Sequence, residues 1–502
     1  MRPFVPRPAL LLALVAACGT AAPDPVEPAS TQPPPAAPVA AGRPESTEPA
    51  PATPLADPYR EVAAKIIAAA EADRGAWEKL SYLTDRIGNR LSGSRALEQA
   101  VTWAVATMKA DGHEGVRAEK VMVPHWVRGA ESGALIAPVA RPIALIGLGG
   151  TVATPRKGLV GDVIVVHDFA ELERRAAEVK GKIVLYDVPL PAYSEEKGPG
   201  YGETVPYRGA GPARAAALGA RAALVRSITA RSLRTPHTGS TRFEEGQKPI
   251  PAAAVSVEDA ELITRLAASG ERVRLRLVLS GRKLPDAPSA NVVGELRGRE
   301  KPDEIVVVSG HLDSWDVGQG AHDDGAGVVG AMQALTLLRK LGLTPRRTIR
   351  VVLWTNEENG LAGSHQYVID HAGELGRHVM AIESDSGGFT PRGFEVQAAD
   401  AALRQITDLV TLLQPIDANR AMARDDAGAD IGALAPAGVP LLGLWVDRAA
   451  YFDYHHSEAD TLDKVDPRAL ARGVAAMAVM AYVVADMPDR LTAGQAPEPA
   501  AK

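Results

Sequence analysis

The chain has 502 residues, with 55 lysines and arginines against 61 aspartates and glutamates, a formal net charge of −6 and a single cysteine. One cysteine excludes an internal disulfide framework and cysteine-based zinc or redox sites, and the slight acidity excludes a strongly basic nucleic-acid-binding protein. The length is enough for roughly two to four domains with a large buried core.

The N-terminal residues 1–18 have the layout of an export signal. Arg2 and Arg7 precede a short apolar stretch, residues 9–17, and Cys18 follows directly. This is the pattern of a secretory signal peptide, and its last residues resemble a bacterial lipobox, in which the cysteine is lipidated. We therefore expect an exported lipoprotein on the periplasmic or cell-surface side of the membrane; a plain signal peptide with an incidental cysteine is the alternative. Since no uninterrupted apolar run is long enough to span a bilayer, this anchor is the membrane contact that we expect.

Residues 19–58 are rich in proline and alanine. Such a composition buries little apolar area and favours extended conformations, so we expect a disordered spacer. After the spacer, the apolar periodicity of residues 59–72 and 97–111 predicts two helices, and Gly112 ends the second. We assign residues 59–139 to the first part of the main domain.

The composition changes in residues 140–285, where short β-branched runs alternate with glycine and proline turns. Residues 162–166, 182–186 and 222–226 are candidate strands, and the alanine-rich residues 212–218 are a candidate helix. This pattern predicts a compact, β-rich domain that is inserted into the main domain.

From residue 291 onwards, candidate strands and helices alternate. The strands are 291–296, 304–309, 348–354, 378–382 and 441–446, and the helices are 325–341, 361–371, 401–413 and 466–486. Apolar strands alternating with helices predict an α/β fold with a mostly parallel central sheet and helices on both faces. We therefore expect the main domain to resume at residues 286–488 and a disordered tail to cover residues 489–502.

Histidine and carboxylate side chains follow several of these strands. They are His311, Asp313 and Asp323; Glu357 and Glu358; Glu383 and Asp385; and His455 and His456. Since ligands bind beyond the carboxyl ends of the strands in open α/β sheets, we expect these side chains to meet. Imidazole nitrogens and carboxylate oxygens are ordinary zinc ligands, and a bridging carboxylate can hold two metal ions. Because Glu357 and Glu358 are adjacent, one can bind metal while the other faces the attacking water.

The motifs that contain these residues resemble those of the carboxypeptidase Q (plasma glutamate carboxypeptidase) family, which are co-catalytic zinc metallopeptidases. The matching segments are 87–93, 123–129, 311–324, 357–358, 383–385 and 455–461, and the resemblance extends from about residue 59 to residue 486. Three phrases of the inserted region, at 180–185, 220–225 and 250–255, resemble a protease-associated domain. The resemblance therefore implies the zinc-exopeptidase fold with an inserted protease-associated domain.

The resemblance also implies a role for each site residue. His311 and Asp385 would bind one Zn²⁺, Glu358 and His456 would bind a second, and Asp323 would bridge the two. Glu357 would be the general base and acid, and Asp313 would orient His311. Tyr454 and His455, with Tyr451 as a further candidate, would contact the oxyanion or the substrate. The family further implies a cis peptide between Asp323 and Asp324 and a homodimer.

The function implied is hydrolysis of dipeptides or short peptides by a metal-activated water and a glutamate base. One alternative is aminopeptidase-type specificity on longer peptides, since no residue pattern decides which end is trimmed. A second is a glutaminyl cyclase-like enzyme, normally with one zinc ion. A third is a receptor-like protein without catalysis, which the complete ligand set disfavours.

Several nearby polar residues have more than one interpretation. Glu383 could replace Asp385 as a ligand, and Asp324 could orient ligands or cap the following helix. For His322 we expect packing away from the metals, for Asp430 a loop charge, and for residues 236–239 a turn.

Overall fold

The computed structural model describes residues 54–195 and 198–492. Cys18, the expected export signal, residues 19–53 of the expected spacer and residues 493–502 of the expected tail lie outside them. Within the described part, Ala56 is buried and Asp57–Tyr59 forms a short 3-10 helix, η1. Residues 56–58, which the sequence assigned to the spacer, therefore belong to the folded domain, because Ala56 packs into the main hydrophobic core.

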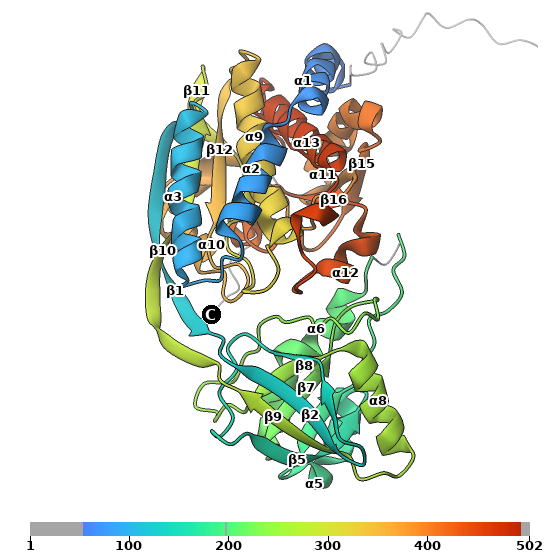
Figure 1. Ribbon diagram of the computed structural model, residues 1–502. Helices are drawn as coiled ribbons and strands as arrows, with labels where there is room; N and C mark the ends of the chain where they lie inside the picture. The colour runs from blue at the N-terminus through green and yellow to red at the C-terminus, as the bar shows by residue number, and fades with distance from the viewer. Residues whose placement is uncertain (1–53, 196–197, 493–502) are drawn as a thin grey trace, which may run out of the picture. The chain divides into compact units, whose positions relative to one another are not determined.

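The central sheet has eight strands in the order β1-β10-β12-β11-β13-β16-β14-β15 (Figure 1). Its strands are β1 (Glu114–Val127), β10 (Arg282–Leu296), β11 (Lys301–His311), β12 (Arg347–Trp354), β13 (His378–Glu383), β14 (Pro391–Gln397), β15 (Arg420–Ala423) and β16 (Leu441–Val446). The middle strands β12, β11, β13 and β16 are parallel, whereas β1 pairs antiparallel with β10, β10 with β12 and β14 with β16; the edge strand β15 is parallel to β14. The predicted α/β fold is confirmed, and the sheet is parallel at its centre and mixed at both sides.

Helices cover both faces of this sheet. They are α1 (Arg60–Ala72), α2 (Gly75–Tyr82), α3 (Arg95–Ala110), α9 (Ala326–Lys340), α10 (Ala362–Asp370), α11 (Asp400–Leu409), α12 (Tyr451–Tyr454) and α13 (Pro467–Asp486). Val306 and Val308 of β11 belong to the core under α9 and α13, while Val307 packs on the other face with Tyr367 of α10. This alternation follows from the two-residue period of a strand.

Short helical turns connect the longer elements. They are η2 (Leu83–Ile87), η3 (Ala321–Gly325), η4 (Leu375–Arg377), η5 (Val410–Ile416), η6 (Ile431–Ala437), η7 (Arg448–Ala450) and η8 (Leu462–Lys464). Helix α13 is long and apolar enough to cross a membrane by length and composition, but 83% of its most apolar stretch is buried in the protein. It is therefore a core helix of the domain, packed against α9 and the sheet.

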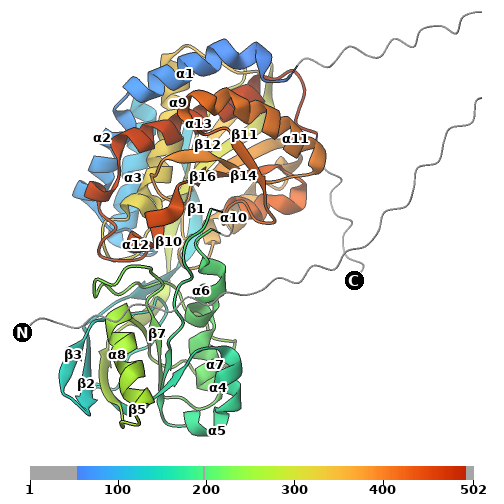
Figure 2. The same ribbon diagram turned by 90° about the vertical axis from the view of Figure 1, so that its right-hand side faces the viewer.

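The part of the chain that lies between β1 and β10 in sequence forms a second sheet of eight strands, in the order β3-β2-β9-β5-β6-β7-β8-β4 (Figure 2). Its strands are β2 (Glu131–Ala137), β3 (Arg141–Ile143), β4 (Leu145–Gly147), β5 (Leu159–Val166), β6 (Ile183–Tyr186), β7 (Ala222–Arg226), β8 (Ala252–Val255) and β9 (Arg274–Leu279). Its helices are α4 (Phe169–Arg174), α5 (Ala176–Val179), α6 (Tyr201–Gly209), α7 (Gly211–Ala217) and α8 (Val257–Ala268).

This inserted region differs from the prediction in its boundaries and in its secondary structure. It begins with β2 at Glu131 and ends with β9 at Leu279, rather than at residues 140 and 285. The change in amino-acid composition does not mark the domain boundary. The paired strands β1 and β10 extend beyond the rest of the central sheet before the chain enters the second sheet. Strands β5 to β8 are parallel and carry helices, so the region is α/β rather than only β-rich.

Two buried histidines of the main domain link its stability to pH. Burial lowers the pKa of His113, next to Thr336 of α9, to about 4, and burial likewise lowers the pKa of His378 in β13 to about 4. In the unfolded chain a histidine titrates near 6.5. Between these values the unfolded state binds the proton and the folded state does not, so stability is lost as the pH falls below about 6.5.

We therefore expect His113 alone to cost about 2 kcal/mol of unfolding free energy between pH 7 and pH 5. Urea unfolding of the wild type and of His113→Gln at both pH values measures this. The variant should lose about 2 kcal/mol less than the wild type over this interval. Equal losses in the two proteins would contradict a neutral, buried His113.

Candidate metal centre

The predicted site residues meet at the carboxyl ends of the parallel strands. His311 is the last residue of β11, Glu357 and Glu358 follow β12, and Asp385 follows β13. Asp323 lies in η3, between β11 and α9. The histidine pair that follows α12 completes the group, which lies where ligands bind in open α/β sheets.

His311, Asp323 and Asp385 form one group of potential ligands. The Nε2 atom of His311 lies 3.3 Å from Oδ1 of Asp323 and 3.3 Å from Oδ1 of Asp385, and the imidazole is 1% exposed. Its Nδ1–H donates to the backbone carbonyl oxygen of Asp313 at 3.0 Å, which directs the Nε2 lone pair towards the two carboxylates. The three ligand atoms are close enough together to hold one metal ion.

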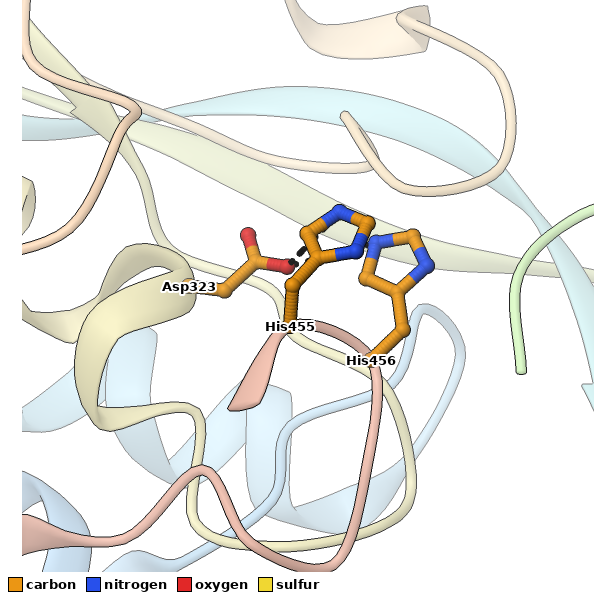
Figure 3. Close-up of side chains that lie close together, drawn as sticks. All are labelled: Asp323, His455 and His456. Carbon is orange, nitrogen blue, oxygen red and sulfur yellow. Dashed lines mark ion pairs between the residues drawn. The ribbon is translucent and has the colours of Figure 1, made fainter. Parts of the chain in front are cut away.

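His456, Asp323 and Glu358 form a second group. The Nε2 atom of His456 lies 3.2 Å from Oδ2 of Asp323 and 3.0 Å from Oε2 of Glu358. His455 stacks on His456 with 3.5 Å between ring centroids, and its Nε2 lies 3.8 Å from the same Asp323 oxygen (Figure 3). Asp323 thus directs one carboxylate oxygen towards each group, which is the arrangement of a bridging ligand.

The charges in this centre fit a bound cation. Asp323, Glu358, His311 and His456 are buried. Oε1 of Glu358 has no hydrogen-bond partner among the described residues. Burial, followed by the neighbouring Asp323, raises the pKa of Glu358 to about 7. Buried carboxylates without such compensation are costly, and the mixed imidazole and carboxylate donor set is one that zinc prefers. The residues present therefore fit a zinc site.

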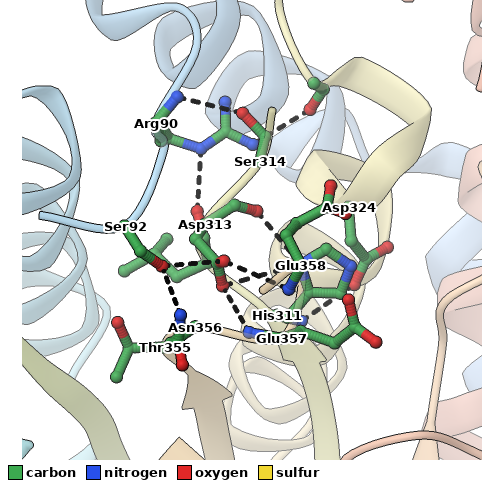
Figure 4. A network of polar contacts seen from close by, with 12 residues as sticks. Arg90, Ser92, His311, Asp313, Ser314, Asp324, Thr355, Asn356, Glu357 and Glu358 are labelled. Carbon is green, nitrogen blue, oxygen red and sulfur yellow. Dashed lines mark hydrogen bonds and ion pairs between the residues drawn. The ribbon is translucent and has the colours of Figure 1, made fainter. Parts of the chain in front are cut away.

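The carboxylate of Asp313 holds the two glutamates rather than His311. Its Oδ1 accepts a hydrogen bond from the backbone N–H of Glu357 at 3.0 Å, and its Oδ2 accepts from Ser92 at 3.2 Å (Figure 4). The same carboxylate lies 3.8 Å from Nδ1 of His311, beyond hydrogen-bond distance. His311 is oriented instead by the Asp313 carbonyl, a distinction that depends on backbone geometry and is not encoded in the spacing of the residues.

Glu357 is placed to act on a proton. Its side chain lines a cavity of about 1110 Å³ together with Asp323, Glu358, Asp385 and His456. Burial, and then the charges of Asp385 and Glu358, raise its pKa well above the usual value for a glutamate. A carboxyl group that faces the cavity next to the candidate ligands is positioned for general acid–base work.

Of the candidate contact residues, Tyr451 and His455 line this cavity, whereas Tyr454 does not. The ring of Tyr454 stacks on His322, with 5.7 Å between centroids and an interplanar angle of 9°. His322 also stacks on Phe389, at 4.2 Å, so it packs away from the ligand groups as expected. Residues 454 and 455 are adjacent, and the end of α12 directs their side chains to opposite sides.

The remaining polar residues support the centre from outside. Asp324 accepts hydrogen bonds from the backbone N–H groups of His311 and Gly327, so it both orients a ligand and caps α9. Its peptide bond with Asp323 is cis, as the family resemblance implied. Glu383 accepts from the backbone of Asp430 and Ile431 instead of facing the ligands.

Two supporting residues escaped the sequence analysis. Arg90 is fully buried and donates to the carbonyl oxygens of Leu312, Gln319 and Gly320, which fixes the loop between β11 and η3. Asp460 accepts from the backbone N–H groups of His322 and Asp323. Both residues lie inside segments noted for their resemblance, which was the only signal for them.

The inserted region contacts the histidine pair directly. The backbone N–H of Thr238 donates to the carbonyl oxygen of His456 at 2.8 Å, and Nδ1–H of His237 donates to that of His455 at 2.6 Å. The residues expected to form only a turn therefore hold the segment that carries the candidate ligand. This role follows from tertiary contacts across more than 200 residues of sequence.

Comparisons with known proteins agree with this arrangement. The family model described as peptidase family M28 matches residues 291–483. Carboxypeptidase Q of Homo sapiens is 41% identical over 434 residues, covering 86% of this chain and 90% of that protein. Carboxypeptidase Q of Xenopus laevis is 43% identical over 437 residues, covering 86% and 91%.

Solved structures of peptidases are also similar to this chain. A peptidase M28 precursor from Shewanella amazonensis SB2B has a TM-score of 0.83 at 36% identity and covers 87% of this chain and 98% of its own. A zinc aminopeptidase from Bacillus subtilis shares the fold, with a TM-score of 0.60 at 20% identity, over 84% of this chain and 98% of its own. Identity above 40% to carboxypeptidase Q over most of both chains decides the family. The chain therefore belongs to peptidase family M28 and is a zinc metallopeptidase of the carboxypeptidase Q type.

Proposed function

We propose that this protein is a dizinc exopeptidase that hydrolyses dipeptides or short peptides. The observation that carries the proposal is the position of Asp323 between two ligand groups. Its Oδ1 lies 3.3 Å from His311 and its Oδ2 lies 3.2 Å from His456, and each histidine has one further carboxylate beside it. This is the donor pattern of a two-metal hydrolytic site.

The chemistry follows from the groups that face the cavity. Zinc ions bound there would polarise the scissile carbonyl and lower the pKa of a bound water. Glu357, which is not needed as a ligand, takes the proton of the attacking water and returns it to the leaving amine. Tyr451 and His455 line the same cavity and are candidates to donate a hydrogen bond to the oxyanion.

We extend the proposal to the regions around the catalytic domain. The sequence pattern around Cys18 supports export and lipid anchoring, and the phrases of the inserted region support a protease-associated domain. The homodimer implied by the family resemblance stays a prediction.

A dipeptide-library assay with and without a chelator, run together with metal quantification, tests the proposal. We expect two zinc ions per chain, loss of dipeptide hydrolysis on chelation and recovery when zinc is added back. One zinc ion per chain with cyclisation of N-terminal glutamine would instead indicate a glutaminyl cyclase-like enzyme. Bound metal without any turnover would indicate a receptor-like protein.

A further inference from the structure

The two histidines of the metal centre are held by different parts of the protein. His311 is oriented by the carbonyl oxygen of Asp313, so its support comes from the main domain. His456 receives its supporting contacts from residues 237–238, which lie in the inserted region. The candidate zinc site that contains His456 therefore depends on the inserted region for its geometry, whereas the site that contains His311 is supported from within the main domain.

The backbone of His456 has an unfavourable conformation. Its φ angle is +59°, in the left-handed region, which residues other than glycine adopt at a cost in free energy. Such a conformation persists where the surrounding contacts impose it. The N–H of Thr238 donates to the carbonyl oxygen of His456 at 2.8 Å, and Nδ1–H of His237 donates to the carbonyl oxygen of His455 at 2.6 Å. These carbonyls belong to the two peptide groups that flank the Cα atom of His456, so both groups are held from the inserted region.

The inserted region also orients the imidazole of His456. The carbonyl oxygen of Thr238 lies 3.3 Å from Nδ1 of this ring, and Nη1 of Arg208 lies beside the same nitrogen, at 3.2 Å. An imidazole that coordinates zinc through Nε2 carries its proton on Nδ1. Nδ1–H then donates to Thr238, and Nε2 is directed towards Asp323 and Glu358. The backbone of Thr238 thus fixes both the main chain and the ring of His456.

The segment that makes these contacts is itself fixed to the second sheet. His237 is 3% exposed, and its backbone N–H donates to Oγ of Ser227, the residue after β7, at 3.0 Å. Oγ1 of Thr238 donates to the carbonyl oxygen of Gly147 in β4 at 2.9 Å. Because the segment is bonded to the second sheet on one side and to His456 on the other, a displacement of the inserted region would also displace His456.

We propose that the inserted region controls the occupancy of the second zinc site, and that His237 is the positioning residue. While its contacts with residues 455–456 are intact, Asp323, Glu358 and His456 bind Zn²⁺ tightly; when they are lost, the chain keeps the zinc ion at His311 and loses the other. The inference rests on the two-zinc centre proposed above. Since coupling between two binding equilibria is reciprocal, the second zinc ion must also hold the inserted region in place.

The first test measures zinc binding to the full chain by competition with a chelator of known affinity. We expect His237→Leu to weaken the binding of one of the two zinc ions by about 10- to 100-fold, the usual effect of removing a group that orients a metal ligand. The binding of the other ion should stay within about threefold of the wild type. His237→Asn, whose amide can donate from nearly the position of Nδ1, should recover most of the lost affinity.

The matched control is Arg231→Met. Arg231 also joins the inserted region to the main domain, since its Nε lies 2.7 Å from Oδ2 of Asp453 in α12. It is 63% exposed and pairs with a side chain instead of the carbonyl groups beside His456. An exposed ion pair contributes little, so this variant should bind both zinc ions with wild-type affinity.

A second test uses hydrogen exchange and leaves His237 unchanged. Zinc added to the metal-free wild type should slow the exchange of backbone amides in residues 227–242 by about tenfold or more, because the second zinc ion stabilises the contacts of this segment. In His456→Ala, zinc should still bind at His311, but exchange in residues 227–242 should stay at the metal-free rate. Mass spectrometry of peptides from the exchanged protein measures both rates.

Three results would overturn the inference and leave the two-zinc centre intact. They are a folded His237→Leu variant with two wild-type zinc affinities, an equal weakening of both ions by this substitution, and exchange in residues 227–242 that is the same with and without zinc. The second of these would show a general structural role for His237. A wild type that binds one zinc ion per chain would instead contradict the two-zinc centre of the proposed function.

Discussion

Replacing Glu357 with glutamine is expected to lower kcat for peptide hydrolysis by about 1000-fold. The amide has nearly the same shape but cannot accept the proton of the attacking water. Because Glu357 lines the cavity beside the ligand groups and is not required as a ligand, the variant should bind as much zinc as the wild type. Steady-state kinetics on a dipeptide and metal quantification on the same sample measure both quantities.

Glu244→Gln is the matched control, since Glu244 lines the same cavity, is exposed and is not one of the candidate ligands. It should retain kcat within about threefold, the scale of a surface substitution. A Glu357→Gln variant with near wild-type kcat would show that another group transfers the proton. A variant that loses zinc would show that Glu357 is a ligand.

Replacing Asp323 with asparagine is expected to remove at least one zinc ion per chain and to lower kcat/KM by about 1000-fold or more. The two carboxylate oxygens of Asp323 face different histidines, His311 and His456. An amide has one oxygen and no charge, so it cannot bridge two metals or offset their repulsion. Metal analysis of the purified variant and a dipeptide assay with added zinc measure the two effects.

Asp316→Asn serves as the control for Asp323. This carboxylate lies on the same connection between β11 and α9 but pairs with Arg128 at 2.7 Å instead of facing the ligands. The control should keep both zinc ions. If Asp323→Asn also kept two zinc ions and full activity, the bridging role would be wrong.

Much of the fold could be predicted because its strands are buried on both faces. Residues 348–354 and 441–446 are mostly apolar stretches of strand length, and they form β12 and β16 within a residue of the expected limits. Helices α9 and α13 were predicted by the same apolar periodicity. The domain boundaries were harder to predict, because β1 and β10 are long strands that extend to the boundary between the two sheets.

The candidate site was predictable to the extent that it lies at strand ends. Residues that directly follow parallel neighbouring strands lie close together, so the strand ends grouped His311 with the Glu357–Glu358 pair and Asp385, and the family resemblance selected the ligands among them. The direction of each side chain was not predictable in this way. Tyr454 and His455 are neighbours in sequence, but one packs on His322 and the other lines the cavity.

The amino-acid sequence by itself therefore determined the family and the central α/β fold, because these depend on motifs and on local apolar patterns. The resemblance to the family supplied the candidate zinc ligands, and their roles stay a prediction. Tertiary structure alone decided that the Asp313 carboxylate holds the glutamates, and that Arg208 and Thr238 of the inserted region reach His456. Those contacts join residues far apart in the chain. Whether such residues meet depends on how the two sheets and their loops pack, which no local pattern encodes.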